Sequence, residues 1–183
     1  MSRKKRPKNP AVNLIVKALR KRHPENAWAF ATEIDTITGH PRDHLHYDGP
    51  GGTRRIDAFA MALWPSKGYR RVAYEIKTSR ADWLAEIHHP EKRAQAYYLS
   101  HEFWFALSTG VFREDDLRVT DDGEVDKDLI HNCGIMEIQD DGSIKTIRSC
   151  RGRSAWPMPE QFITSLLRRV RDCEWRKDIT NWF

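Results

Sequence analysis

The tripeptide Glu75-Ile76-Lys77 puts an acid and an amine two positions apart at the end of an apolar run. If this run is a β-strand, successive side chains alternate between its two faces. Glu75 and Lys77 then share one face, and Ile76 lies on the other. A salt bridge at the end of a strand is the ordinary explanation for such a tripeptide, so the tripeptide alone predicts no reaction.

A second acid, Asp57, lies inside the apolar run of residues 55–64. Aspartate is depleted in strands, so its presence there requires a reason. Residues 55–64 and 70–77 flank the turn sequence Pro65-Ser66-Lys67-Gly68, and the three segments together predict a β-hairpin.

The register of this hairpin decides whether Asp57 meets Glu75. If Trp64 pairs with Arg70, Asp57 lies opposite Lys77 and diagonal to Glu75, with the two backbones about 7–8 Å apart on one face. A shift of one residue would turn Asp57 to the wrong face. We predict that the two carboxylates lie close enough to hold one ion.

Two carboxylates placed in this way suit a hard divalent cation. Asp57, Glu75 and the backbone carbonyl of Ile76 all offer oxygen, which Mg²⁺ or Mn²⁺ accepts more readily than zinc does. Such an ion polarises a scissile phosphate and acidifies a bound water. Lys77 could orient or deprotonate that water, or neutralise charge that develops on phosphorus.

Four helices are expected around these residues. Residues 10–22 and 157–170 have an amphipathic periodicity, Ser79 and Asp82 have the spacing of a capping box, and a further helix is expected from residue 90 to about 100. In the last helix, the apolar residues expected to face the core are Phe162, Ile163, Leu166, Leu167 and Val170.

Further strands are expected at residues 28–34 and 103–107, and a second hairpin at 134–138 and 143–147. A right-handed crossover through the intervening helices would make strand 103–107 parallel to strand 70–77. The sequence therefore predicts an α/β fold with a mixed central β-sheet flanked by helices.

Composition narrows the class of protein. The chain has 183 residues, 39% of them hydrophobic and 31% charged, which is typical of a folded domain. No apolar run approaches the roughly 18 residues of a membrane span, and we expect a cytoplasmic protein that binds no membrane. Residues 1–9 are expected to form a basic disordered tail, and residues 10–183 a single domain.

The charged tail and the cysteines carry little information about function. The net charge of +5 matches five positive charges in the tail, at Arg3, Lys4, Lys5, Arg6 and Lys8. Such a tail either attracts phosphate without regard to sequence or is simply a solvated terminus. The three cysteines are far apart, which argues against a zinc knuckle or a disulfide framework.

Asp57, then Glu75-Ile76-Lys77 at a hairpin, then a helix, resembles the pattern of the PD-(D/E)xK nuclease superfamily. Residues 55–58, 74–84 and 103–106 resemble the MmcB-like DNA-repair proteins and their phage relatives. The resemblance implies a restriction-endonuclease-like core that hydrolyses DNA phosphodiester bonds with Mg²⁺ or Mn²⁺. It also implies a role in DNA repair, recombination or phage DNA processing, in a prokaryotic or phage-infected cell.

The resemblance also implies roles for individual residues. It gives metal ligation to Asp57 and Glu75 and the role of the catalytic lysine to Lys77. Many members add an acid from an earlier element, for which Glu33 is a candidate, although a solvent-facing acid explains it nearly as well. Some members have a glutamine on the following helix. Gln95 is in range, but Tyr98 follows it after three residues instead of four.

Several basic and polar residues flank the predicted site. Arg55, Ser79, Arg80 and Lys92 could contact DNA phosphates together with Gln95, although solvated strand and helix ends are the ordinary explanation. The loop histidines His40, His44 and His46 could hold a metal, but a polar loop is the better explanation.

Two other classes of function stay open. The chain could be a catalytically weak nuclease-fold module that binds DNA or assists repair, because a fold and its residues do not guarantee turnover. Asp57, Glu75 and Lys77 could also form only an ion-pair cluster in a structural protein. Cleavage of both strands of a duplex would favour a homodimer.

Overall fold

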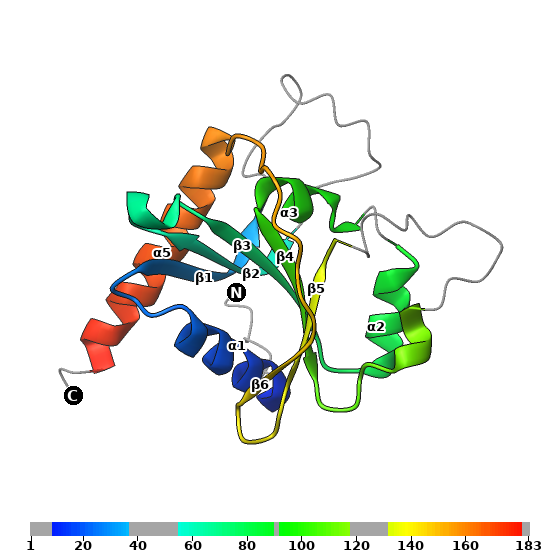
Figure 1. The fold of residues 1–183 in the computed structure, drawn as a ribbon. Helices are drawn as coiled ribbons and strands as arrows, with labels where there is room; N and C mark the ends of the chain where they lie inside the picture. The colour runs from blue at the N-terminus through cyan, green and yellow to red at the C-terminus, as the bar shows by residue number, and fades with distance from the viewer. Residues whose placement is uncertain (1–8, 37–54, 90–91, 118–131, 181–183) are drawn as a thin grey trace, which may run out of the picture.

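Six strands form one mixed β-sheet whose order follows the chain, as the computed structural model shows for residues 9–36, 55–89, 92–117 and 132–180 (Figure 1). β3 pairs with β4 and β4 with β5 in parallel, and the other neighbouring strands are antiparallel. The expected α/β fold, parallel crossover and two hairpins are therefore confirmed. The strands are β1 (Trp28–Asp35), β2 (Arg55–Ala62), β3 (Arg71–Lys77), β4 (Glu102–Ser108), β5 (Gly134–Ile138) and β6 (Ile144–Arg148).

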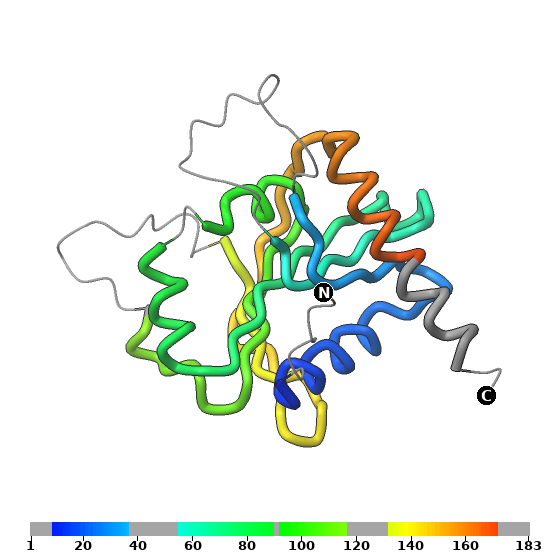
Figure 2. The backbone as a smooth tube through the Cα atoms, turned by 180° about the vertical axis from the view of Figure 1, so that it is seen from behind, coloured from blue at the N-terminus to red at the C-terminus, as the bar shows by residue number. Residues whose placement is uncertain are grey.

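Helices cover both faces of the sheet (Figures 1 and 2). α1 (Pro10–Arg22) packs on one face, in a cluster of buried residues with the β2, β3, β4 and β5 side chains that point toward it. α2 (Arg80–Ile87), α3 (Ala94–Leu99) and α5 (Glu160–Thr180) contribute to a second cluster on the other face. The expected basic tail and the histidine loop lie outside the described residues.

Local sequence accounts for the ends of the helices that frame the site. The side chain of Asn9 accepts a hydrogen bond from Ala11 N at 3.0 Å, and Pro10 occupies the first turn of α1. Ser79 caps α2 by accepting from Asp82 N at 3.2 Å, as the capping-box spacing predicted. α2 therefore begins three residues after the last residue of β3.

The prediction for the last helix was partly wrong. α5 begins at Glu160 and reaches Thr180, and it buries Phe162, Ser165 and Leu166. Ile163 and Leu167 were expected in the core, but they are 36% and 62% exposed. The reason is geometric: each follows a buried residue by one position, which is about a quarter turn around the helix and away from the sheet.

The predicted register of the first hairpin was also wrong, by two residues. Ala58 pairs with Tyr74 and Met61 with Arg71, so Trp64 does not pair with Arg70. The connection is longer than a tight turn: it holds the 3-10 helix η1 (Pro65–Lys67), followed by positive φ angles at Gly68 and Tyr69. Because the error is an even number of residues, every side chain keeps its predicted face.

Candidate active site

Asp57 and Glu75 lie directly opposite each other at the end of the β2–β3 ladder. The last pair of this ladder is Ala58 with Tyr74, and the two acids are the next residue on each strand. The prediction that Asp57 faces Lys77 is corrected by this register, since the carboxylate stands opposite Glu75 instead. The two acids are therefore closer together than in the diagonal arrangement expected from the sequence.

A hydrogen bond explains why an aspartate is tolerated in this strand. Asp57 Oδ2 accepts a hydrogen bond from the backbone N–H of Ile76 at 2.9 Å. The side chain therefore satisfies a β3 backbone donor just beyond the last residue pair of the ladder. The N–H and C=O of a strand residue point to the same side, so the Ile76 carbonyl also points toward β2. Asp57 and Glu75 thus stand opposite each other, and the Ile76 carbonyl points toward the strand that carries Asp57.

Lys77 lies between two carboxylates. Its Nζ is 2.6 Å from Glu75 Oε1 and 3.0 Å from Glu86 Oε2. Glu86 extends from α2, and Arg93 Nη1 donates to its carboxylate at 3.3 Å and to its backbone oxygen at 2.7 Å. A continuous chain of ion pairs thus runs from Glu75 through Lys77 and Glu86 to Arg93.

Glu86 and Arg93 were not found from the sequence. Glu86 lies on the buried stripe of α2 between Trp83 and Ile87, and an acid on such a stripe is rarely buried without a partner. That position was the available signal. Arg93 offers no comparable periodic signal, because it lies in the short connection before α3.

Burial and crowding shift the proton affinities of the two acids. Burial, and then the charge of Asp57, raise the pKa of Glu75 to about 8. Burial also raises the pKa of Asp57, against the opposing effects of the Ile76 N–H and the Lys77 charge. Burial and mutual repulsion therefore both disfavour the doubly ionised pair, and a bound cation would relieve that repulsion.

Lys77 behaves in the opposite way. Burial lowers its pKa, but the charges of Glu75 and Glu86 outweigh burial, and the net shift is upward. Lys77 is therefore a stable cation in this arrangement. Of the roles expected for it, the stabilisation of negative charge fits better than the deprotonation of water.

The oxygen donors fit a metal ion that keeps several water ligands. Among the described residues, neither Asp57 Oδ1 nor Glu75 Oε2 makes a hydrogen bond, so each carboxylate has one oxygen to offer. Within the same ranges, no three His, Cys, Asp or Glu side chains gather into a metal-binding group. Mg²⁺ is commonly held by one or two carboxylates with water and substrate phosphate completing its shell, so a two-carboxylate set fits it.

Glu33 is adjacent to this site on β1. It stands between the pairs Thr32–Ala58 and Ile34–Ile56, which gives it the position opposite Asp57. Its side chain is exposed, and its φ of 55° is unusual for a residue other than glycine. Such strain persists where the surroundings impose it and is more frequent at functional sites. The backbone of Glu33 thus lies across from Asp57, but among the described residues its side chain does not join the two acids in a group of three.

The residues expected to contact DNA fall into two groups. Arg55 and Lys92 are exposed, and the charge of Arg55 is among those that act on Asp57. Gln95 is half-buried on α3, and its Oε1 accepts from Thr36 Oγ1 at 2.6 Å beyond the end of β1.

The second group has structural contacts. Arg80 forms a two-pronged ion pair with Asp116 and donates to Val111 O at 2.9 Å, while Ser79 caps α2. These bonds fix the segment that follows β4 against the start of α2.

Comparisons of the chain with protein families, with curated proteins and with solved structures found no match. None of the helices within the described ranges is both long and apolar enough to span a bilayer.

Proposed function

We propose that this chain is a metal-dependent deoxyribonuclease of the PD-(D/E)xK type, with a restriction-endonuclease-like core. The observation that carries the proposal is the meeting of Asp57 and Glu75 at the end of two paired central strands, with Lys77 on the same face as Glu75. The position supports it too, because ligands of open α/β sheets commonly bind at the carboxyl ends of parallel strands, and Glu75 lies two residues before the end of β3, beside the parallel β4.

Each residue has a defined part in the proposed reaction. Asp57 and Glu75, with the Ile76 carbonyl, would hold Mg²⁺ or Mn²⁺, which when bound supplies polarisation of the scissile phosphate and an acidified water. Lys77 is kept charged by Glu75 and Glu86, so it stabilises negative charge on the phosphate oxygens as the bond to the leaving oxygen breaks. Glu86 is a positioning residue, because it acts through Lys77.

The proposed substrate is DNA. Arg55 is an exposed cation whose charge acts on Asp57, and Lys92 is a second exposed cation, between α2 and α3. Both could neutralise backbone phosphates, which supply much of the affinity of nucleic-acid binding. Two copies of the chain would be needed to cut both strands of a duplex at once.

A second candidate is a DNA-binding or repair-accessory module without cleavage. The observation in its favour is that ion pairs link Glu75, Lys77, Glu86 and Arg93 to one another without any bound ligand. Lys77 already partly neutralises Glu75, as a purely structural cluster would require.

A cleavage assay separates the two candidates. Labelled single-stranded and duplex DNA would be incubated with Mg²⁺, with Mn²⁺ or with a chelator, with wild type beside Lys77→Ala. The matched control is Lys145→Ala, which removes the same charge from an exposed position on β6. Metal-dependent cutting that is lost only in Lys77→Ala supports the nuclease. DNA binding without cutting under any metal supports the accessory module.

A further inference from the structure

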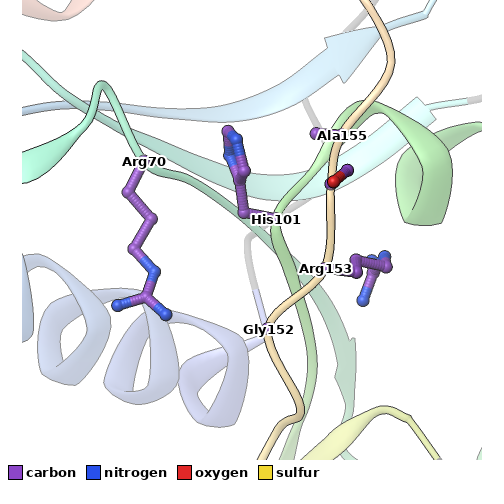
Figure 3. A pocket seen from close by; sticks show the side chains of 6 residues that line it. Arg70, His101, Gly152, Arg153 and Ala155 are labelled. Carbon is purple, nitrogen blue, oxygen red and sulfur yellow. The ribbon is translucent and has the colours of Figure 1, made fainter.

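An open pocket of about 610 Å³ lies at the opposite end of the central strands from the acids. Arg70 directly precedes β3 and His101 directly precedes β4, so both lie at the amino ends of these parallel strands. The segment 152–155 completes the lining with Gly152, Arg153, Ser154 and Ala155 (Figure 3). At about 3.3 Å per residue, the five steps from Arg70 to Glu75 put this pocket roughly 17 Å from Glu75.

The charges around the pocket are mainly positive. Arg70 and Arg153 line it, and the charge of Arg71 acts on His101 with theirs. The acid that faces these groups is Glu102, which is 2.8 Å from Arg70 Nη2. Three guanidinium groups against one carboxylate leave an excess of positive charge, which favours an anionic ligand.

His101 is prepared to act as a neutral donor. Its Nδ1 accepts a hydrogen bond from Arg71 N at 3.0 Å, so in the neutral ring the proton resides on Nε2. Burial, and then the charges of Arg71, Arg70 and Arg153, lower the pKa of His101. The ring thus contributes an N–H at neutral pH without needing a charge.

Arg153 is rigidly held. Its Nη2 donates to Tyr97 O at 2.6 Å, and its guanidinium lies over the Tyr97 ring, with Cζ 3.4 Å from the ring centroid. Among the described residues, its Nη1 is buried and has no hydrogen-bond partner. A fixed cation with an unsatisfied N–H loses little freedom when an anion arrives.

Two exposed aromatic residues directly adjoin pocket-lining residues in the sequence. Trp156 directly follows Ala155 and is 47% exposed, although one ring face stacks on Tyr98 with 4.5 Å between centroids and 11° between planes. Tyr69 directly precedes Arg70 and is 49% exposed. Proteins commonly bind single-stranded nucleic acid with aromatic side chains beside cations. The bases stack on the aromatic rings, and the cations contact the phosphates.

We propose that this pocket binds a backbone phosphate of single-stranded nucleic acid, with an adjacent base stacked on Trp156. Arg70, the His101 N–H and the Ser154 hydroxyl contact the phosphate, and Arg153 supplies a fixed positive charge beside it. The site shares no residue with the acidic cluster, so it stands or falls independently of the proposed nuclease activity.

The test is the binding of a fluorescently labelled oligothymidylate to the full chain, followed by anisotropy in the presence of a chelator, so that cutting plays no part. Trp156→Ala is expected to weaken binding about tenfold, and Trp156→Phe to retain most of the affinity, because a base–aromatic stack contributes roughly 1–3 kcal/mol. Arg70→Ala is expected to weaken binding about fivefold and to lower the slope of log affinity against log salt by about one.

Two controls make the result decisive. Arg168→Ala and Lys145→Ala each remove a positive charge from an exposed position, on α5 and on β6, and both variants should bind as wild type does. Equal affinity of wild type, Arg70→Ala and Trp156→Ala overturns the proposal. A second outcome also overturns it. Inorganic phosphate would raise the melting temperature of wild type but not of Arg70→Ala, while Arg70→Ala and Trp156→Ala would bind the oligonucleotide as wild type does. The pocket would then be a site for a free anion.

Discussion

Tyr74 and Glu75 are neighbours on β3, but they point to opposite faces of the sheet. The buried polar groups on these two faces differ in their charge. On the α1 face, Tyr74 OH lies 2.6 Å from His23 Nε2, and both residues are buried. Burial, and then the charge of Arg22, lower the pKa of His23 to about 4, while burial raises the pKa of Tyr74. This pair is therefore neutral at physiological pH.

On the α2 face, Glu75 belongs to a cluster that contains a stable cation, Lys77. Glu75, Lys77 and Glu86 are 17%, 15% and 8% exposed at their side chains, so they are partly desolvated but not sealed. A buried neutral pair serves packing and specificity. A partly open cluster with two acids of raised pKa carries an energetic cost that function can explain.

The largest expected difference between the two faces is in catalysis. Glu75→Gln should lower the rate of Mg²⁺-dependent DNA cleavage by about 10²–10³-fold, as the loss of a single electrostatic group does in other active sites. Tyr74→Phe, one residue away, should leave the rate within about twofold, because it removes a hydroxyl from the other face. Equal losses in both variants would show that the two faces do not differ in function.

The second effect is on stability. Glu86→Ala should lower the free energy of unfolding by about 3–5 kcal/mol, because it leaves the buried Arg93 and the adjacent Lys77 without a shared counter-ion. Glu86→Gln keeps the hydrogen-bonding shape and should cost less. Urea denaturation at neutral pH measures both variants. A loss below about 1 kcal/mol in Glu86→Ala would contradict a structural role for this ion pair.

The third effect is acid sensitivity of the α1 face. The folded protein holds His23 neutral down to about pH 4, whereas the unfolded chain takes up a proton near 6.5. The contribution of His23 to stability is thus present above pH 6.5 and is lost as pH falls toward 4, to an extent of at most about 3 kcal/mol. Thermal unfolding from pH 7 to 4.5 should show this loss in wild type and a reduced loss in His23→Phe. Identical pH profiles would contradict it.

The fourth effect has the opposite sign and is on the α2 face. Because the pKa of Glu75 is raised, the metal-free folded protein keeps a proton that the unfolded chain releases above about 4.5. Stability should fall as pH rises from there toward 8, and Lys77 should moderate this fall. Glu75→Gln should remove this part of the slope when unfolding is measured with a chelator present. An unchanged slope in that variant would assign the effect to other acids.

Periodicity predicted the strand faces, but it could not predict the pairing. The side-chain alternation of residues 55–62 and 71–77 fixes which residues face α2, and this part was confirmed. The pairing depends on how many residues the connection contains. This connection contains η1 and two residues with positive φ, Gly68 and Tyr69, so it is longer than a tight turn.

The chemistry of the site was predictable only in part. Asp57, Glu75 and Lys77 stood out because charged residues interrupt apolar strands. Glu86 and Arg93 acquire their roles only when α2 and the start of α3 pack over β3 and β4, and such a contact has no local pattern in the sequence. The membership of the nuclease superfamily stays a prediction.

The central claim is that Asp57 and Glu75 together bind a divalent cation, and calorimetric titration with Mn²⁺ tests it most directly. Wild type should bind the ion, and Glu75→Gln should bind at least about tenfold more weakly, because ligand and supporting groups typically change metal affinity by 10–100-fold. Glu102→Gln, an acid at the other end of the sheet beside Arg70, should bind as wild type does. Absence of binding to wild type, or equal affinity of wild type and Glu75→Gln, would contradict the account.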